Sequence, residues 1–268
     1  MTEEWLRSAS RAITPARIDT SAPNPARVWD AMNGGRDNFE ADRTVARHMV
    51  DAAPVLARAG AAGWAFRMRV ARSAAEAGIR QFLDISMGMR NLPVSQPLGQ
   101  GAGPGSRLVF VADDPVVLLH LRAMLRSSVP ASVSCVEADP FDLGSVLRGA
   151  SEVLDLREPV AVLLPDTLNF TANASDAVAT LVAGVPSGSY LAVIQAAPDE
   201  RLALAARRWN RLYPMPTYSR GADEVASWFT GCDILEPGVV EMHRWRPGSD
   251  DPEYPDGMPL LGAVARKL

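Results

Sequence analysis

The chain has 268 residues, of which 47% are hydrophobic and 22% are charged. These proportions supply enough apolar material for one sizeable core and exclude disorder over most of the chain. The 27 basic and 31 acidic residues give a formal net charge of −4, and no dense run of Lys and Arg occurs, so nucleic acid is not expected as a partner.

Residues 1–80 carry helical periodicity broken by turn signals. Small and apolar side chains recur at steps of three and four between residues 54 and 77, which is the spacing of one face of an amphipathic helix. Gly78 follows directly and predicts the end of this helix. We predict that residues 1–80 form a helical N-terminal cap and that residues 81–268 form the core.

From residue 81 onward, short apolar runs alternate with helical segments. Asp114 and Pro115 predict the start of one helix, and a second is predicted from Ser175 to Gly184. The runs are too short for helices and continuously apolar, as in strands buried on both faces; they span residues 81–85, 107–112, 132–136, 159–164 and 190–194. Alternating strands and helices predict an α/β fold, a parallel sheet with helices on both faces.

Two later segments complete this pattern. Residues 91–106 contain four glycines and three prolines, which favour a loop over a helix. A helix is predicted after Ser219, followed by apolar runs at 234–242 and 260–265. We expect these two runs to pair as an antiparallel hairpin at one edge of the sheet.

Several other kinds of site and location are disfavoured. Cys135 and Cys232 lie far apart in the sequence and the three histidines are scattered, so neither a disulfide framework nor a metal site is expected. No stretch of the sequence approaches the roughly 20 apolar residues of a membrane span. The acidic start of the chain lacks the pattern of a secretory signal. We expect a cytoplasmic protein without a membrane partner.

Polar side chains follow the predicted strands, at the edge where open parallel sheets bind ligands. Asp84, Asp113 and Asp139 belong to the ends of the first three strands, and Asp166 and Asn169 follow the fourth. Acidic groups at three successive strand ends suit a ligand rich in hydroxyl and amino donors, such as a nucleoside. Asp is also an ordinary helix N-cap; this is the favoured interpretation for Asp114 and an open alternative for Asp113 and Asp139.

One long run is specific enough to point to a family. Residues 18–43 read IDTSAPNPARVWDAMNGGRDNFEADR, and this run resembles the opening of an actinobacterial family of S-adenosylmethionine-dependent methyltransferases, formerly a domain of unknown function. The resemblance continues through GIRQFLDI at 78–85 and DPVVLLH at 114–120 to GAVARK at 262–267. It therefore covers essentially the whole chain from residue 17.

The resemblance implies a fold and an activity. The expected fold is a Rossmann-like class I methyltransferase, with a mostly parallel seven-stranded sheet and the N-terminal cap closing over the cofactor. The implied cofactor is S-adenosylmethionine, and the implied partner is a small-molecule acceptor, with a role in secondary metabolism. A homodimer is compatible with the sequence.

The resemblance also assigns cofactor-binding residues. Asp84 and Gly88 match the turn after the first strand, where the methionine part of the cofactor binds, and Asp139 matches the residue that faces the adenine amine. In the N-terminal motif, the matching residues are expected to line the cap side of the cofactor; they are Gly34, Gly35, Asp37, Asn38 and Phe39.

The departures from the family pattern affect binding. Ser86 replaces the first glycine of the turn and would crowd the backbone approach that glycine permits. Ala112 replaces the acidic residue at the end of the second strand, so Asp113 becomes the expected ribose contact. A lost charge-assisted hydrogen bond costs about 1.5–3 kcal/mol, or roughly ten- to a hundredfold in affinity. We therefore expect weakened cofactor binding.

The acceptor side departs as well. Asn169 and Gln195 stand where the family has histidines, which removes the nearest general bases without excluding catalysis, because methyl transfer depends mostly on alignment. Asp166 is the carboxylate placed to act as base beside Asn169, and Tyr213 or Tyr218 is expected to shape the acceptor pocket. The alternative is a protein of this fold that has lost methyl transfer and acts as a binding or regulatory protein, or as a non-methylating enzyme such as a cyclase.

Overall fold

A computed structural model describes residues 18–86, 105–119, 121, 133–213, 215–249, 251–254 and 256–268. This part of the chain contains one sheet in the order β3-β2-β1-β4-β5-β8-β6, with β7 paired to β8. The strands are β1 (Gln81–Ile85), β2 (Arg107–Ala112), β3 (Val133–Glu137), β4 (Val160–Leu164), β5 (Tyr190–Ala196), β6 (Cys232–Ile234), β7 (Val240–Glu241) and β8 (Leu260–Lys267).

The direction of the strands confirms the predicted mostly parallel sheet. Each neighbouring pair from β3 to β5 is parallel, and β8 is antiparallel to both β5 and β6. The chain order reverses on either side of β1, which lies between β2 and β4. Such a reversal opens a crevice at the carboxyl ends of the strands.

The predicted hairpin near the C-terminus is confirmed in the antiparallel pairing of its two runs. It is wrong in the extent of the first strand and in the position of the second within the sheet. Residues 234–242 do not form one strand, because Pro237 and Gly238 interrupt the run and a proline has no N–H for the ladder. The run instead contributes to β6 and β7, which both pair with β8. β8 therefore lies inside the sheet, between β5 and β6, rather than at its edge.

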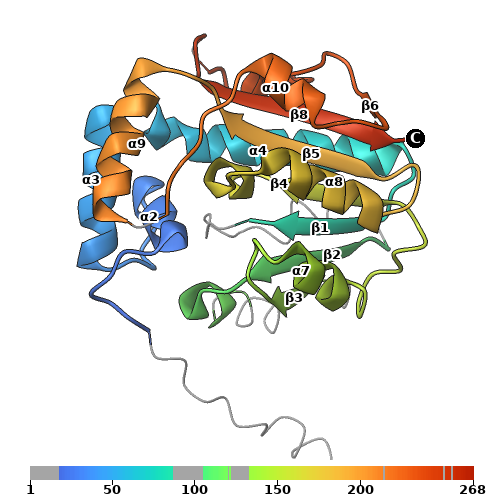
Figure 1. Cartoon of the computed structure of the whole chain (residues 1–268), viewed down its shortest axis with the longest axis horizontal. Helices are drawn as coiled ribbons and strands as arrows, with labels where there is room; N and C mark the ends of the chain where they lie inside the picture. Colours follow the sequence, from blue (N-terminus) through green and yellow to red (C-terminus); the bar gives the residue numbers. More distant parts are fainter. Residues whose placement is uncertain are drawn as a thin grey trace, which may run out of the picture.

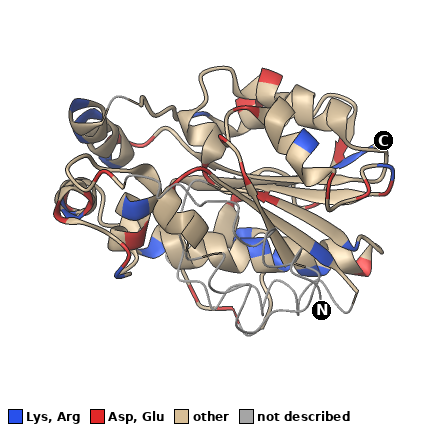
Figure 2. Cartoon of the chain, turned by 90° about the horizontal axis from the view of Figure 1, so that it is seen from below, with Lys and Arg blue, Asp and Glu red and all other residues tan. Residues whose placement is uncertain are grey.

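Helices cover both faces of the sheet (Figure 2). On one face α4 (Leu56–Glu76) packs Phe66 and Val70 into a core shared with Phe82 of β1. On the opposite face lie α7 (Leu143–Ala150), α8 (Ala174–Gly184) and α10 (Ala222–Ser227), packed on the alternate side chains of the same strands. Burial on both sides explains why the strand sequences are continuously apolar.

Predicted helix ends are confirmed at two places. The helix predicted over 54–77 spans Leu56–Glu76 and ends before Gly78, whose φ of 89° lies in the left-handed region that glycine adopts without strain. Asp114 accepts hydrogen bonds from the N–H groups of Val116 and Val117, and residues 115–119 are helical. Asp114 is therefore an N-cap, as expected.

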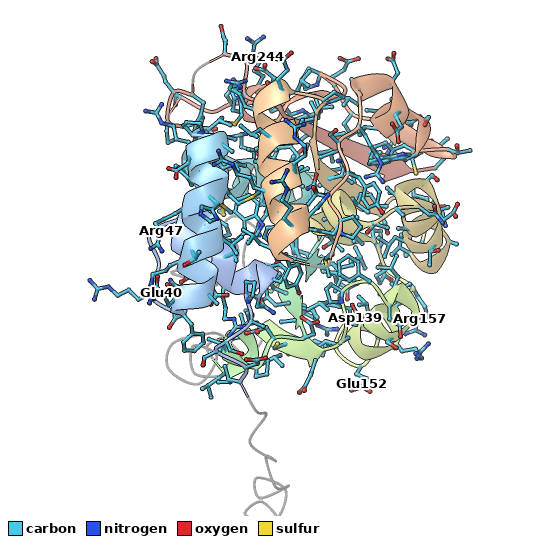
Figure 3. The ribbon with its side chains drawn as sticks, turned by 60° about the vertical axis from the view of Figure 1, so that its left-hand side comes forward. Glu40, Arg47, Asp139, Glu152, Arg157 and Arg244 are labelled. Atoms are coloured by element: carbon cyan, nitrogen blue, oxygen red, sulfur yellow. The ribbon has the colours of Figure 1, made fainter. Side chains whose placement is uncertain are left out.

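Three helices gather beyond the carboxyl ends of the strands, where the arrows of β1 and β5 point (Figure 1). They are α2 (Pro25–Met32), α3 (Glu40–Ala52) and α9 (Glu200–Leu212). Figure 3 shows α3 beside α9, with Glu40 and Arg47 on the outer surface of α3; Arg208 of α9 donates a 2.9 Å hydrogen bond to the carbonyl of His48. The boundary of the cap at residue 80 stays a prediction, since α4 lies on the sheet.

Among the residues that the structure describes, no helix is long and apolar enough to span a bilayer.

Candidate functional site

The carboxyl end of β1 is tied to α4 by an ion pair inside the core. Asp84 Oδ2 lies 3.2 Å from Arg67 Nη2, and both side chains are almost fully buried. The Arg67 guanidinium also lies 4.9 Å from the ring centre of Trp64. Neither carboxylate oxygen of Asp84 has a hydrogen-bond partner among the described residues. The contact of Asp84 with cofactor stays a prediction.

Two exposed carboxylates lie beyond β2 and β3. Ala112, the last residue of β2, is buried, whereas Asp113 is exposed, as is Asp139 two residues after β3. Although the Asp113 side chain reaches solvent, the protein atoms around it reduce its solvation and raise its pKa, and the negative charges of Asp139 and Asp114 raise the pKa further. Asp139 also accepts a 2.9 Å hydrogen bond from the N–H of Phe141. The repulsion between these carboxylates would be relieved by a ligand that offers hydroxyl or amino donors.

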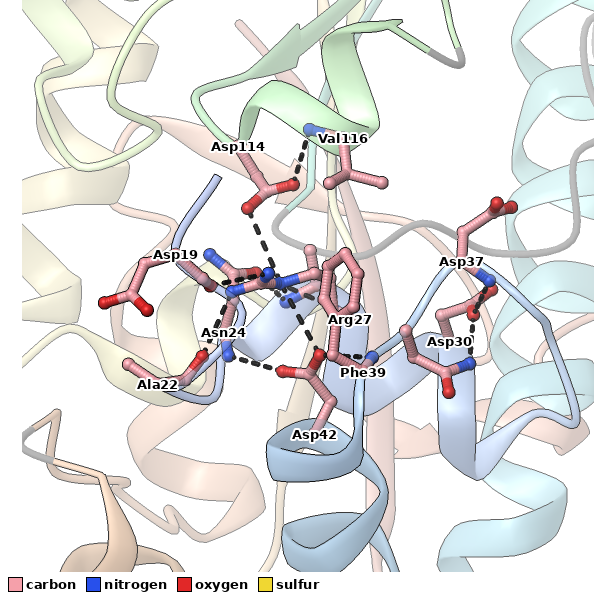
Figure 4. Close-up of polar contacts among 12 residues, drawn as sticks. Asp19, Ala22, Asn24, Arg27, Asp30, Asp37, Phe39, Asp42, Asp114 and Val116 are labelled. Atoms are coloured by element: carbon pink, nitrogen blue, oxygen red, sulfur yellow. Dashed lines mark hydrogen bonds and ion pairs between the residues drawn. The ribbon is translucent and has the colours of Figure 1, made fainter. Parts of the chain in front are cut away.

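The N-terminal motif folds around the carboxylate of Asp30 (Figure 4). This carboxylate accepts hydrogen bonds from the N–H of Asp37 at 2.9 Å and from Nδ2 of Asn38 at 2.7 Å. A Cβ on Gly35 would lie 1.9 Å from Asp30 Oδ1. Only glycine therefore lets the chain pass this carboxylate, while Gly34, at φ 74°, makes the turn.

Arg27 connects the cap helices to the end of β2. Its Nε lies 3.6 Å from Asp42 Oδ2 and 3.8 Å from Asp114 Oδ2, and its guanidinium lies 5.1 Å from the ring centre of Phe39. Asp42 in turn accepts 2.8 Å hydrogen bonds from the N–H groups of Asn24 and Phe39. Figure 4 shows these contacts converging on Arg27. They fix α2 and α3 next to Asp113.

The sequence analysis assigned no role to Arg27, Asp30 or Asp42. All three are charged, and none of them is more than 4% exposed to solvent. Asp42 accepts the N–H of the N-cap residue Phe39 from the first turn of α3, but Phe39 has no side-chain acceptor, so the sequence lacks the capping-box pattern that would have marked Asp42. The burial of Arg27 and Asp30 had no signal in a single sequence.

At the ends of β4 and β5, Asn169 and Gln195 belong to one hydrogen-bond network. Asn169 Oδ1 accepts from the N–H of Ala196 at 2.7 Å and from Gln195 Nε2 at 3.0 Å. Gln195 Nε2 also donates to the carbonyl of Tyr218 at 2.8 Å. Both amides therefore hold the strand ends and the loop at 217–219 in place. A catalytic role for Asn169 stays a prediction.

Arg220 holds the backbone next to the same network in place. It donates hydrogen bonds to the carbonyls of Leu168, Thr171 and Ala172, in and after the 3-10 turn η1 (Thr167–Phe170). Burial lowers the pKa of Arg220, an effect opposed by the nearby Glu224 carboxylate. Asp166 lies at the start of η1 and is 2% exposed.

A largely apolar pocket opens beside this network. It lies between α2, α3, α9, η1 and the end of β5, and the space there measures about 770 Å³ when the open solvent at its mouth is included. The lining residues share apolar or aromatic side chains with few polar ones: Trp29, Met32, Met49, Leu56, Asn169, Phe170, Ala196, Leu202, Ala203, Ala205, Ala206, Trp209, Thr217, Tyr218, Ser219 and Leu260. Tyr218 lines this pocket, and the ring centre of Tyr213 lies 5.1 Å from that of Trp209. That either tyrosine shapes an acceptor pocket stays a prediction.

A third group of titratable residues lies away from this edge. Glu241, His243 and Asp256 each offer a ligand atom within 4.8 Å of the others. Arg244 already pairs with Glu241 at 3.2 Å and with Asp256 at 2.6 Å. Burial lowers the pKa of His243. The group is accounted for as an ion-pair network.

The remaining two predicted site residues belong to the turn predicted after β1. Ser86 follows β1 directly and is half-buried. Gly88 lies outside the described residues, so the backbone approach to a ligand at this turn stays a prediction.

Comparisons with known proteins converge on one family. A family model described as S-adenosyl methyltransferase matches residues 11–268. A DUF574 family protein from Streptomyces avermitilis is 34% identical, with a TM-score of 0.84 over 94% of this chain and 100% of that one. A candidate methyltransferase from Thermobifida fusca is 30% identical, with a TM-score of 0.84 over 96% of this chain and 99% of that one. No curated protein matches.

Proposed function

Because this chain belongs to the S-adenosyl methyltransferase family, we propose that it transfers the methyl group of S-adenosylmethionine to a small-molecule acceptor. The observation that carries the proposal is the pair of exposed carboxylates, Asp113 and Asp139, beyond the reversal point of the sheet. Their chemistry fits a nucleoside, which presents ribose hydroxyls and an exocyclic amine to acceptor oxygens.

The nucleoside end of the cofactor is assigned to these carboxylates. Asp113 takes the ribose hydroxyls in place of the acidic residue missing at Ala112, and Asp139 takes the adenine amine. Ser86, directly after β1, and Gly88, outside the described residues, are the residues proposed to bind the methionine end, and Asp84 is paired with Arg67 at the end of β1. When bound, the cofactor supplies a methyl group on a positively charged sulfur.

The N-terminal motif acts mainly by shaping the cap. Gly34, Gly35 and Asn38 fold the end of α2 around Asp30, while Phe39 packs against Arg27. Arg27 then places this cap against Asp114, one residue from the proposed ribose contact. We assign to the cap the role of holding the chain at Asp114, and with it the position of the neighbouring Asp113.

Acceptor chemistry is assigned to the ends of β4 and β5. Asp166, at the start of η1, is the proposed base; it is 2% exposed and is not itself a lining residue of the pocket, whereas Asn169 and Phe170 of the same turn are. Asn169 positions the wall of the pocket through its bonds to Gln195 and Ala196. The free thiols of Cys135 and Cys232 are compatible with a reducing, cytoplasmic location. Neither the described residues nor the comparisons favour the alternative of a fold that has lost methyl transfer.

Methyl transfer is tested by supplying methyl-labelled S-adenosylmethionine together with small phenols and amines. The expected result is an acceptor-dependent release of S-adenosylhomocysteine and a product that carries the label. Replacing Asp166 by Asn should lower the turnover number, since the amide cannot take a proton. The absence of labelled product, together with an absence of cofactor binding, would overturn the proposal.

A further inference from the structure

We propose that the pocket between α2, α3 and α9 is the acceptor site and that it selects an uncharged, planar aromatic molecule whose single hydroxyl or amino group is bound by Thr217. This inference rests on the proposed function, since it names the class of acceptor for the same reaction. It is carried by the side chains of the pocket wall, independently of the residues assigned to the cofactor.

Four aromatic rings from separate elements face this space. Trp29 comes from α2, Phe170 from η1, Trp209 from α9 and Tyr218 from the loop after α9. The ring centres of Phe170 and Trp209 lie 5.6 Å apart at an interplanar angle of 51°. Rings tilted against one another present both faces and edges, to which a flat aromatic ligand can stack.

The wall is preformed rather than adaptable. The indole N–H of Trp209 donates a 2.7 Å hydrogen bond to the carbonyl of Met215, which fixes the ring. Asn169 is held by Ala196 and Gln195. A rigid wall loses little entropy on binding and favours one ligand shape.

The charge of the wall decides against ionic ligands. No Asp, Glu, Lys or Arg is among the described residues that line the pocket, and its other large side chains are Met32, Met49, Leu56, Leu202 and Leu260. Transferring a carboxylate or phosphate into such surroundings is costly without a partner charge. The acceptor group is therefore an uncharged one.

One polar group in the wall is left without a partner. The hydroxyl oxygen of Thr217 is buried and has no hydrogen-bond partner among the described residues, although its backbone N–H bonds Asn210. A buried hydroxyl without a partner is costly. Thr217 is a lining residue of the pocket, so a rotation of its side chain toward the pocket would let this hydroxyl bond a hydroxyl or amino group of the ligand.

The space itself is created by small side chains on α9. Ala203, Ala205 and Ala206 line the pocket on this helix, where larger side chains would fill it. Ala206 is half-buried, and Leu204 on the same helix is 37% exposed and is not a lining residue. These two positions provide a matched pair of substitutions.

The pocket is tested by titrating the chain with 1-naphthol and measuring binding by calorimetry and by quenching of tryptophan fluorescence. Wild type is expected to bind saturably, A206W to lose at least tenfold in affinity, and L204W to bind as wild type does. S-adenosylhomocysteine should bind all three equally. Equal binding of 1-naphthol to A206W and wild type would overturn the assignment of the pocket.

The role of Thr217 is tested by T217V, which keeps the shape of the side chain and removes its hydroxyl. We expect T217V to weaken binding of 1-naphthol about tenfold and to leave binding of naphthalene unchanged. An equal effect on both ligands would overturn the assigned hydrogen bond.

Two further results bear on the class of acceptor. Binding of 1-decanol as tightly as 1-naphthol would overturn the aromatic class in favour of an alkyl chain. Failure of 1-naphthol to bind, with or without S-adenosylhomocysteine, would overturn the inference while leaving the proposed methyl transfer intact. If 1-naphthol binds and S-adenosylhomocysteine does not, the result would count against the proposed methyl transfer and would still support the pocket.

Discussion

Arg67 and Asp84 form an ion pair sealed between α4 and β1, with side chains 4% and 0% exposed and 3.2 Å between Nη2 and Oδ2. Taking two charges out of water is costly, and their attraction offsets this cost only while both are present. The pair fixes the position of α4 on the strand whose carboxyl end opens into the crevice. It therefore links the stability of the core to the geometry of the site.

Replacing Arg67 by Met should destabilise the fold by about 3–5 kcal/mol, because it leaves the Asp84 carboxylate buried without a partner. The double variant R67M/D84L removes both charges and should recover most of this loss. Urea unfolding followed by circular dichroism measures the free energy of unfolding of both variants. A double variant no more stable than R67M would show that the pair is not coupled.

Gly35→Ala should cost about 1–3 kcal/mol, since the new Cβ would overlap the Asp30 carboxylate at 1.9 Å and force it from its hydrogen bonds. Gly248→Ala is the control, because its Cβ would meet only the flexible end of Arg72 at 3.6 Å. Thermal unfolding compares the two variants with wild type. Equal midpoints for the two variants would contradict this explanation of the motif.

Local sequence patterns predicted the sheet well. Continuous apolar runs predicted the bounds of β1 to β5 to within one or two residues, and Asp114 predicted the start of a helix. Both patterns involve only residues that are neighbours in the chain. The split at Pro237 and the position of β8 inside the sheet were missed, because they depend on pairing between distant segments.

The site was predictable at the level of strand ends and not at the level of contacts. The sequence placed Asp113 and Asp139 beyond adjacent strands, which follows from parallel topology. It did not reveal that Asn169 and Gln195 bond to each other, or that Arg27 bridges Asp42 and Asp114. These contacts join segments that no local pattern relates.

The pH dependence of stability provides a test of the carboxylates at β2 and β3. The pKa of Asp113 is raised by burial and by Asp139 and Asp114, so the native state binds this proton more tightly than the unfolded chain does. Its contribution to stability is present below its ordinary pKa of 3.8 and is lost as the pH rises through the higher native value.

Asp113→Asn removes the group whose ionisation lowers the free energy of unfolding. The variant should therefore become more stable relative to wild type as the pH increases from 3 to 7. Urea unfolding at a series of pH values measures the difference. A constant difference between D113N and wild type over this range would show that Asp113 does not experience the neighbouring charges.

Replacing Arg220 by Lys should destabilise the chain by about 2 kcal/mol or more, because a single ammonium cannot serve the carbonyls of Leu168, Thr171 and Ala172 together. Since η1 carries Phe170, the variant should also bind 1-naphthol less tightly. Arg157→Lys, at an exposed position three residues before the amino end of β4, is the control and should change neither property. Wild-type stability in R220K would contradict the bracing role.

The carboxyl edge of the sheet is proposed to hold an adenosyl cofactor through Asp113. Isothermal titration of the full chain with S-adenosylhomocysteine tests it most directly, with D113N in parallel. We expect one saturable site in wild type and an affinity roughly ten- to a hundredfold lower in D113N. No heat at millimolar ligand, or identical affinities for both proteins, would contradict it.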